Sequence, residues 1–166
     1  MRTVSGEVIM REKKDRVKDL SKMLKSVKAS DIMTKDVIVT KKSATLSEIA
    51  EIMIEKRISG LPVMSSSGKV LGIITENDLF MVMDMVRSGD IPHSGRNAKK
   101  GPTVDFAMST KVHKIKTNTN LEDIIVLMKY KNAHTLPVMK GKKMAGVIGR
   151  RDVFKKFYSI VKKLHL

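Results

Sequence analysis

Two aspartates occupy equivalent places in two similar stretches of the chain. Asp78 lies in GIITENDLF (72–80) and Asp152 in GVIGRRDVF (146–154), and both stretches predict a strand that turns directly into a helix. A carboxylate at the start of a helix is stabilised by the helix dipole. It can also accept hydrogen bonds from both hydroxyls of a cis-diol, which is how proteins commonly hold a ribose. The two aspartates are therefore candidate sugar-binding groups.

The same residues could instead serve only the start of the helix. Thr75 and Asp78 have the spacing of a capping box, in which the hydroxyl accepts from a helix N–H and the acid bonds back to the backbone. This interpretation is weaker in the second stretch, because Gly149 has no hydroxyl although Asp152 is kept. At this point both roles remain open.

No other group of residues predicts catalysis or a metal site. The chain has no cysteine, so thiolate metal sites and disulfides are excluded. Its four histidines show neither an HExxH motif nor paired metal-ligand spacing. The turn SSSGK (65–69) lacks the pattern of a phosphate-binding loop, and no GxSxG motif occurs. We therefore predict a protein that is not an enzyme and requires no metal or cofactor.

The two aspartates belong to an internal repeat. Residues 31–64 align with residues 106–139 at an offset of 75, and the tetrapeptide LPVM ends both segments. After a deletion of one residue the offset becomes 74, which places Gly146 on Gly72 and Asp152 on Asp78. The chain therefore contains two copies of one structural unit.

Each unit predicts the order β-α-β-β-α. A short strand (36–40 or 112–116) leads into a helix, then a hairpin and a second helix (76–87 or 151–164). Ser43 or Thr45 could cap the first helix of the first unit, and Asn118 or Asn120 that of the second. One unit is too small to bury its own sheet, so we expect the two units to pack together.

Both units resemble cystathionine-β-synthase (CBS) domains, and the pair resembles a Bateman module. The resemblance rests on LPV followed by the glycine, apolar pair and aspartate, in two copies in register, and it covers 29–86 and 103–162. It implies an α/β fold of two pseudo-symmetrically paired repeats. The predicted segments are a basic N-terminal amphipathic helix, a first CBS domain, a linker and a second CBS domain, at 1–28, 29–87, 88–102 and 103–164.

The resemblance also implies a function and a site. Proteins of this family bind adenosine-containing ligands such as AMP, ADP, ATP, S-adenosylmethionine or NAD in the clefts between paired domains, and they act as sensors. The ligand is thus an effector, and the aspartate of each repeat would hold its ribose. Each cleft would combine residues of both repeats.

In the Asp78 cleft we expect ribose or phosphate contacts from polar residues, backbone contacts from the leading strand of the second repeat, and an aliphatic slot for the base. The residues are Thr75, Asn77, Asp78, Val112, Ala133, His134, Thr135, Leu136 and Pro137. In the Asp152 cleft two arginines could meet phosphate oxygens, and the first repeat supplies the slot. The residues are Val37, Ile58, Ser59, Gly60, Leu61, Pro62, Arg150, Arg151 and Asp152. The lost hydroxyl at Gly149 favours the Asp78 cleft as the stronger site.

The charge of the chain suggests an alternative function. The formal net charge is +16, and the excess of Lys and Arg lies at both ends and in 87–101. Segment 7–28 carries Val17, Leu20, Leu24 and Val27 at helical spacing, with basic residues between them. These basic ends could contact DNA or RNA through phosphates, although aromatic residues for stacking are few.

The remaining expectations concern assembly and location. Such modules commonly pair through their helices into a four-domain disk, and Leu79, Phe80, Met83 and Met85 could supply that contact, so we expect a homodimer. No apolar stretch is long enough to cross a membrane or to act as a signal peptide. We therefore predict a cytoplasmic protein.

Overall fold

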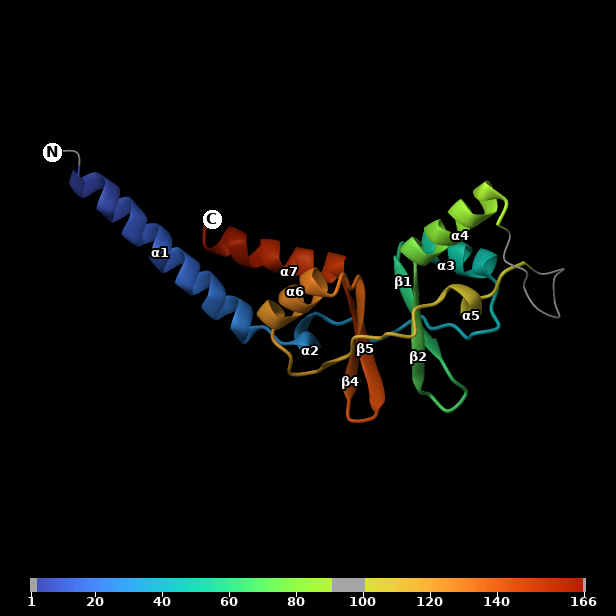
Figure 1. Ribbon diagram of the computed structural model, residues 1–166. Helices are drawn as coiled ribbons and strands as arrows, with labels where there is room; N and C mark the ends of the chain where they lie inside the picture. The colour runs from blue at the N-terminus through green and yellow to red at the C-terminus, as the bar shows by residue number, and fades with distance from the viewer. Residues whose placement is uncertain (1–2, 91–100, 166) are drawn as a thin grey trace.

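The computed structural model describes residues 3–90 and 101–165, and the structural statements below refer to this part of the chain. It contains two small sheets side by side, with the helices of each repeat on the same side of the molecule (Figure 1). A long helix, α1 (Thr3–Ser26), projects from one end. The predicted fold, a mixed α/β pair of repeats preceded by a helix, is confirmed.

In the first repeat, helix α3 (Leu46–Lys56) is followed by the antiparallel hairpin of β1 (Gly60–Met64) and β2 (Val70–Thr75). Helix α4 (Glu76–Ser88) begins directly after β2. The predicted strand 36–40 is wrong in extent, because only Thr40 pairs, in parallel, with Val63. The reason is Pro62, which has no N–H to continue this ladder beyond the Thr40 hydrogen bonds.

The second repeat has the same order. Strand β3 (Ile115–Lys116) is shorter than predicted and pairs in parallel with β4 (Thr135–Lys140), which forms a hairpin with β5 (Lys143–Gly149). Helix α6 (Leu121–Tyr130) lies between β3 and β4, and α7 (Arg150–Lys163) follows β5.

In each repeat, one of the two alternative cap residues caps the first helix. The Thr45 hydroxyl accepts from the Glu48 N–H at 3.3 Å, while Glu48 bonds back to the Thr45 N–H at 2.7 Å. The Asn120 side chain accepts from the Asp123 N–H at 2.9 Å. These contacts end the choice between the alternative cap residues in each repeat.

The segment at the start of each repeat packs on the other repeat. Helix α2 (Ala29–Ile32) places Ala29 in the core of the second repeat, and α5 (Val104–Ala107) places Val104 in the core of the first. Next to them, Thr34 pairs with Val147 and Ser109 pairs with Ile73. This reciprocal exchange ties the two repeats together.

Glycines in the repeated motif permit this exchange. A Cβ added at Gly146 would lie 2.7 Å from the carbonyl oxygen of Thr34. A Cβ added at Gly72 would lie 2.8 Å from the carbonyl oxygen of Ser109. Both distances are too short for real atoms, so each glycine is required by the close approach of another backbone.

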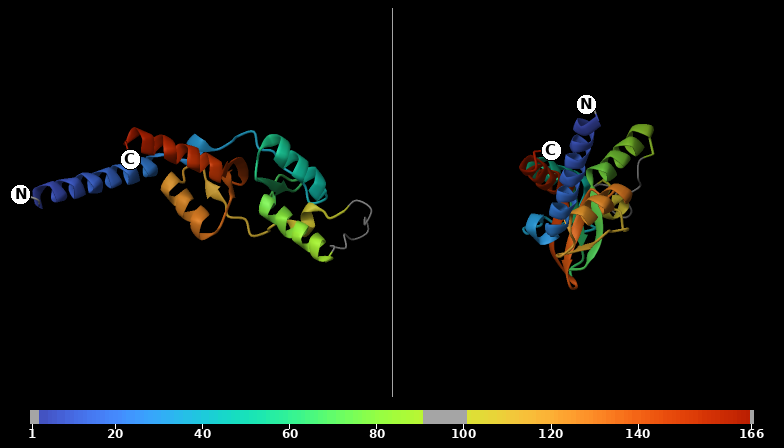
Figure 2. Two further views of the ribbon diagram at one scale, coloured as in Figure 1. Left: turned by 90° about the horizontal axis from the view of Figure 1, so that it is seen from above. Right: turned by 90° about the vertical axis from the view of Figure 1, so that its left-hand side faces the viewer.

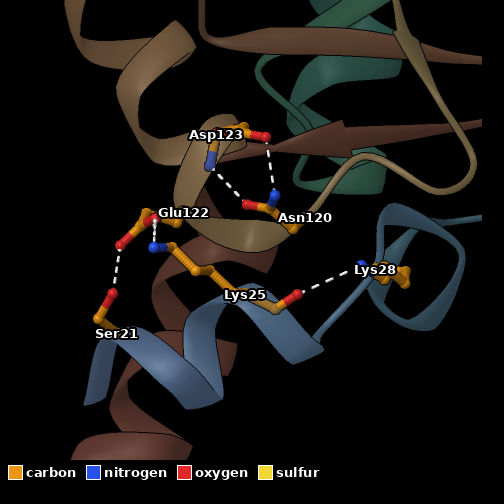
Figure 3. A network of polar contacts seen from close by, with 6 residues as sticks. All are labelled: Ser21, Lys25, Lys28, Asn120, Glu122 and Asp123. Atoms are coloured by element: carbon orange, nitrogen blue, oxygen red, sulfur yellow. Dashed lines mark hydrogen bonds and ion pairs between the residues drawn. The ribbon is translucent and has the colours of Figure 1, made fainter. Parts of the chain in front are cut away.

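Helix α1 packs only its last turns on the second repeat. Leu24 lies in that core, with Leu20, Met23 and Val27 against it. Ser21 donates to the Glu122 carboxylate of α6 at 2.8 Å, and Lys25 pairs with the same carboxylate at 3.5 Å (Figure 3). The rest of α1 extends away from both repeats (Figure 2). No helix in the described residues is long and apolar enough to span a membrane.

Candidate ligand-binding clefts

The Asp78 carboxylate lies where β2 turns into α4. Its Oδ2 atom accepts from the Thr75 N–H at 2.7 Å and from the Thr75 hydroxyl at 2.6 Å. No donor in the described chain reaches Oδ1. The predicted capping box is therefore half formed, because the Thr75 hydroxyl donates to the acid and does not accept from the helix. One carboxylate oxygen fixes the helix start, and the other remains available to a ligand.

The Asp152 carboxylate lies at the equivalent turn from β5 into α7 and accepts one hydrogen bond fewer than Asp78. Oδ2 of Asp152 accepts from the Gly149 N–H at 2.8 Å. Gly149 contributes no hydroxyl, and no further donor of the described chain reaches this carboxylate. Both aspartates thus cap a helix without using all their acceptor capacity.

A cavity of about 500 Å³ opens beside Asp78, between the two repeats. Seven predicted residues line it together: Thr75, Asn77, Asp78, Val112, Ala133, His134 and Thr135. The prediction missed seven others: Ile73, Ser109, Lys111, His113, Tyr130, Lys131 and Asn132. The expectation of a slot without any aromatic residue is wrong, because Tyr130 at the end of α6 lies in the lining. Tyr130 could have been predicted from the sequence, because it lies only three residues before Ala133, a predicted lining residue.

His134 lines the Asp78 cavity and lies near three charged groups, Arg150, Asp78 and Glu76. Partial burial and then the positive charge of Arg150 lower the pKa of His134 below its ordinary value of 6.5. The carboxylates of Asp78 and Glu76 act in the opposite direction but do not cancel these effects. The neutral imidazole is therefore favoured near pH 7.

A second cavity, of about 340 Å³, opens beside Asp152. The predicted residues that line it are Val37, Ile58, Ser59, Gly60, Arg151 and Asp152. The additional lining residues are Thr34, Asp36, Ile38, Lys56, Arg57, Thr135, Val147 and Gly149. Lys56, Arg57 and Arg151 give this cleft three cationic side chains, against the acids Asp36 and Asp152. Both volumes fall within the range of small-molecule sites, roughly 300–1,000 Å³.

Five predicted residues do not line the cleft assigned to them. Four belong to the buried middle of the hairpin strands, with almost no exposed surface: Leu61, Pro62, Leu136 and Pro137. They pack behind the lining residues, because β1 and β4 each enter the core after their first residue. The fifth, Arg150, donates to the Asn132 side chain at 3.0 Å, and Asn132 lines the Asp78 cavity. Of the two adjacent arginines, Arg151 therefore lines the Asp152 cavity, while Arg150 contacts a residue of the Asp78 cavity without lining it.

Each cleft combines a carboxylate with cationic side chains and an apolar wall. This arrangement can hold a diol at the acid, an anionic group at the cations and an apolar ring at the wall. Among the described residues, no three His, Asp or Glu side chains are placed to hold a metal ion.

Comparison with known proteins identifies related chains. The model of the CBS domain matches residues 29–84 and 104–159. The methylated protein MJ0556 of Methanocaldococcus jannaschii is 31% identical over 149 residues, covering 86% of this chain and 81% of that protein. MJ1404 of the same organism is 25% identical over 139 residues, 81% of this chain and 33% of that protein. An inosine-5′-monophosphate dehydrogenase of Nitrosopumilus maritimus is 33% identical over 82 residues, 49% of this chain and 16% of that enzyme. The chain thus spans at most a third of the length of MJ1404 and of the dehydrogenase.

Solved structures share the fold. CBSX2, solved in complex with AMP, superposes with a TM-score of 0.67 at 24% identity, over 81% of this chain and 98% of that chain. The CBS domain pair of MJ0100, solved with 5′-methylthioadenosine and S-adenosyl-L-methionine, gives a TM-score of 0.67 at 22% identity, over 80% and 97%.

Proposed function

Because the chain belongs to the CBS domain family, we propose that it is a regulatory module that binds an adenosine-containing ligand in its two clefts. The observation that carries the proposal is the pair of aspartates. Each has one oxygen fixed at a helix start and a second without a donor, beside an open cavity with cationic lining residues. The complexes of CBSX2 and MJ0100 with adenosyl compounds support this class of ligand.

In the Asp78 cleft, we assign the ribose to Asp78 and the base to the wall formed by Ile73, Ala133 and Tyr130. Lys111 and Lys131 line the same cavity and supply positive charge for a phosphate. In the Asp152 cleft, Ile58 and Val37 form the corresponding wall, and Arg57 and Arg151 the cationic side. AMP, ADP, ATP, S-adenosylmethionine and NAD all carry the required ribose. The larger cavity and the ordered Thr75 favour the Asp78 cleft as the tighter site.

Calorimetry with AMP, ATP, S-adenosylmethionine and NAD tests this proposal. We expect Asp78→Ala and Asp152→Ala each to abolish or weaken one binding event at least tenfold, because a carboxylate bonded to a diol contributes about 1.5–3 kcal/mol. The matched control is Asp84→Ala, since Asp84 lies on the exposed side of α4, bonded to Arg87. If both cleft variants bind every ligand as the wild type does, the ribose assignment is wrong.

A module of this kind needs a partner to which it reports occupancy, and we propose a second copy of the chain. Large apolar side chains stay exposed on the helices of both repeats: Ile54, Phe80, Met81, Met83, Val86, Val126, Tyr130, Phe154 and Tyr158. Pairing of these faces would remove them from water. Sedimentation of the wild type and of Phe80→Glu tests this: the wild type should sediment as a dimer and the variant as a monomer. A monomeric wild type would contradict it.

A specific feature of α1 favours a second candidate function, binding of duplex nucleic acid. Arg11, Lys14, Lys18, Lys22 and Lys25 follow the spacing i, i+3, i+7, i+11 and i+14, so they form one stripe along about 21 Å of helix. The five residues are exposed. The apolar side of the last turns packs on the second repeat, so it is not free to enter a bilayer. A row of cations on a projecting helix suits phosphates.

Fluorescence anisotropy with a DNA or RNA duplex across salt concentrations tests this second candidate. Neutralising Arg11, Lys14, Lys18 and Lys22 to Gln should reduce the slope of log K against log salt by about 3–4. The control replaces four exposed lysines elsewhere, namely Lys35, Lys41, Lys69 and Lys140. Binding that is absent at low salt, or equally weakened by the control, excludes the stripe.

A further inference from the structure

Thr135 is the buried polar residue of the described chain, and it belongs to both clefts. It is the first residue of β4, and 8% of its surface is exposed. It lines the Asp78 cavity together with residues such as Ala133, and it lines the Asp152 cavity together with residues such as Gly60. The two sites therefore share one side chain.

The Thr135 hydroxyl has no hydrogen-bond partner within the described residues. It lies against Gly60, since a Cβ added at Gly60 would be 2.7 Å from Oγ1. Buried hydroxyls in native proteins are generally hydrogen-bonded, and leaving one unpaired costs free energy. A hydroxyl that borders two cavities can satisfy this need with a ligand in either one.

The repeat explains why a single hydroxyl occupies this place. Gly60 and Thr135 are equivalent at the offset of 75, and Thr75 and Gly149 are equivalent at 74. Gly60 pairs with Thr75 in the first hairpin, and Thr135 pairs with Gly149 in the second. The Thr75 hydroxyl is already bonded to Asp78 at 2.6 Å. Of these four positions, Thr135 alone carries a hydroxyl that the described chain leaves without a hydrogen bond.

We propose that Thr135 contacts the ligand and couples the two clefts, an inference that rests on the proposed function. A hydroxyl has one proton, and the ribose and phosphate oxygens of the ligands act as acceptors. The hydroxyl can therefore donate to a ligand in one cleft at a time, by choosing among its staggered χ1 positions. A ligand in either cleft lowers the affinity of the other by the value of one hydrogen bond. That corresponds to about two- to tenfold, and the effect is reciprocal.

Calorimetry with AMP tests the coupling. The affinity of the Asp152 cleft by itself is measured in Asp78→Ala, and that of the Asp78 cleft in Asp152→Ala. Where an alanine variant does not fold, asparagine at that position keeps an acceptor for the helix start. In the wild type, we expect the AMP affinity of the weaker binding event to be two- to tenfold lower than the affinity of the same cleft measured by itself.

Variants of Thr135 decide whether this residue is the cause. Thr135→Val has nearly the same shape without the hydroxyl. In the Thr135→Val chain, the weaker binding event should therefore have the same affinity as that cleft measured by itself, in Thr135→Val combined with the aspartate variant that removes the other cleft. Thr135→Ser keeps the hydroxyl and should preserve the difference. A difference that survives in Thr135→Val, or is absent from the wild type, overturns the inference.

The outcomes separate this inference from the proposed function. Two AMP sites that Asp78→Ala and Asp152→Ala remove one by one, but that bind independently, refute only the coupling. A single AMP site also refutes the coupling. Failure of AMP and of the other adenosyl ligands to bind at all refutes the proposed function, and the inference with it.

Discussion

Gly60 and Thr135 face each other where the two hairpins meet, and they are equivalent residues of the two repeats. A Cβ placed on Gly60 would lie 2.7 Å from the Thr135 hydroxyl oxygen and 3.2 Å from the methyl group of Thr75. Thr135 lines both cavities, and Gly60 lines the Asp152 cavity. The seam between the repeats therefore has room for a second side chain at this place only if the Thr135 hydroxyl or the Gly60 backbone shifts.

Gly60→Ala should lower the free energy of unfolding by about 1–3 kcal/mol, because the added methyl overpacks the seam. Thr135→Ala in the same chain removes the clashing oxygen and should recover part of this loss. Chemical denaturation of the two single variants and the double variant gives their coupling energy. Additive effects would show that the two side chains do not compete for space.

Gly146→Ala should destabilise the pairing of the repeats by about 1–3 kcal/mol, because the new Cβ meets the backbone oxygen of Thr34 at 2.7 Å. A backbone atom cannot move aside as a side-chain end can. The control is Gly149→Ala, whose Cβ would have no neighbour nearer than 3.6 Å and whose φ of −95° suits alanine. Thermal or urea unfolding measures both. Equal stability of the two variants would contradict the close-approach account.

The repeat allowed much of the fold to be predicted from the sequence. Helical periodicity and turn residues gave α4 and α7 within one residue at each end, and the resemblance to CBS domains implied that each cleft combines residues of both repeats. The predicted domain boundaries, the absence of catalysis and the cytoplasmic location stay predictions.

Other features depend on tertiary contacts that no local pattern reports. The leading strands are short because Pro62 and Pro137 interrupt the parallel ladder, a consequence of register between distant segments. Thr135 stands in both clefts because the hairpins meet at that residue. Helix α1 runs from Thr3 to Ser26, whereas periodicity predicted 7–28, since Lys28 adopts an extended conformation. The predicted linker 88–102 lies largely outside the described residues.

Gly149→Thr should raise the free energy of unfolding of the second repeat, by analogy with Thr75, whose hydroxyl bonds to Asp78. Space for a Cβ is available there, and the new hydroxyl could donate to the Asp152 carboxylate as Thr75 does to Asp78. We expect a gain of about 0.5–1.5 kcal/mol from one hydrogen bond. Thr75→Val, which deletes the existing bond, should lose a similar amount. Urea denaturation measures both changes, and a gain without the matching loss would point to backbone entropy instead.

His134 offers a test by pH of the stability of the free protein. Its pKa is lowered in the folded chain, so below about 6.5 the unfolded chain binds more protons at this residue than the folded chain does. Stability should therefore fall as the pH drops from 6.5 through the lowered value. Denaturation between pH 5 and 8 should show that His134→Gln removes part of this fall. An unchanged pH profile would contradict the perturbed environment.

The same residue predicts how AMP binding depends on pH, if the phosphate lies in the Asp78 cleft. A phosphate beside His134 adds negative charge to that of Asp78 and Glu76 and opposes Arg150, so it raises the pKa of His134 and favours proton uptake. The affinity of wild type relative to His134→Gln should then rise about two- to tenfold from pH 8 to 5.5. Taking this ratio cancels the ionisation of the phosphate itself. His113→Gln is the parallel control, because His113 lines the same cavity. A ratio that stays constant across this range would place the phosphate away from His134.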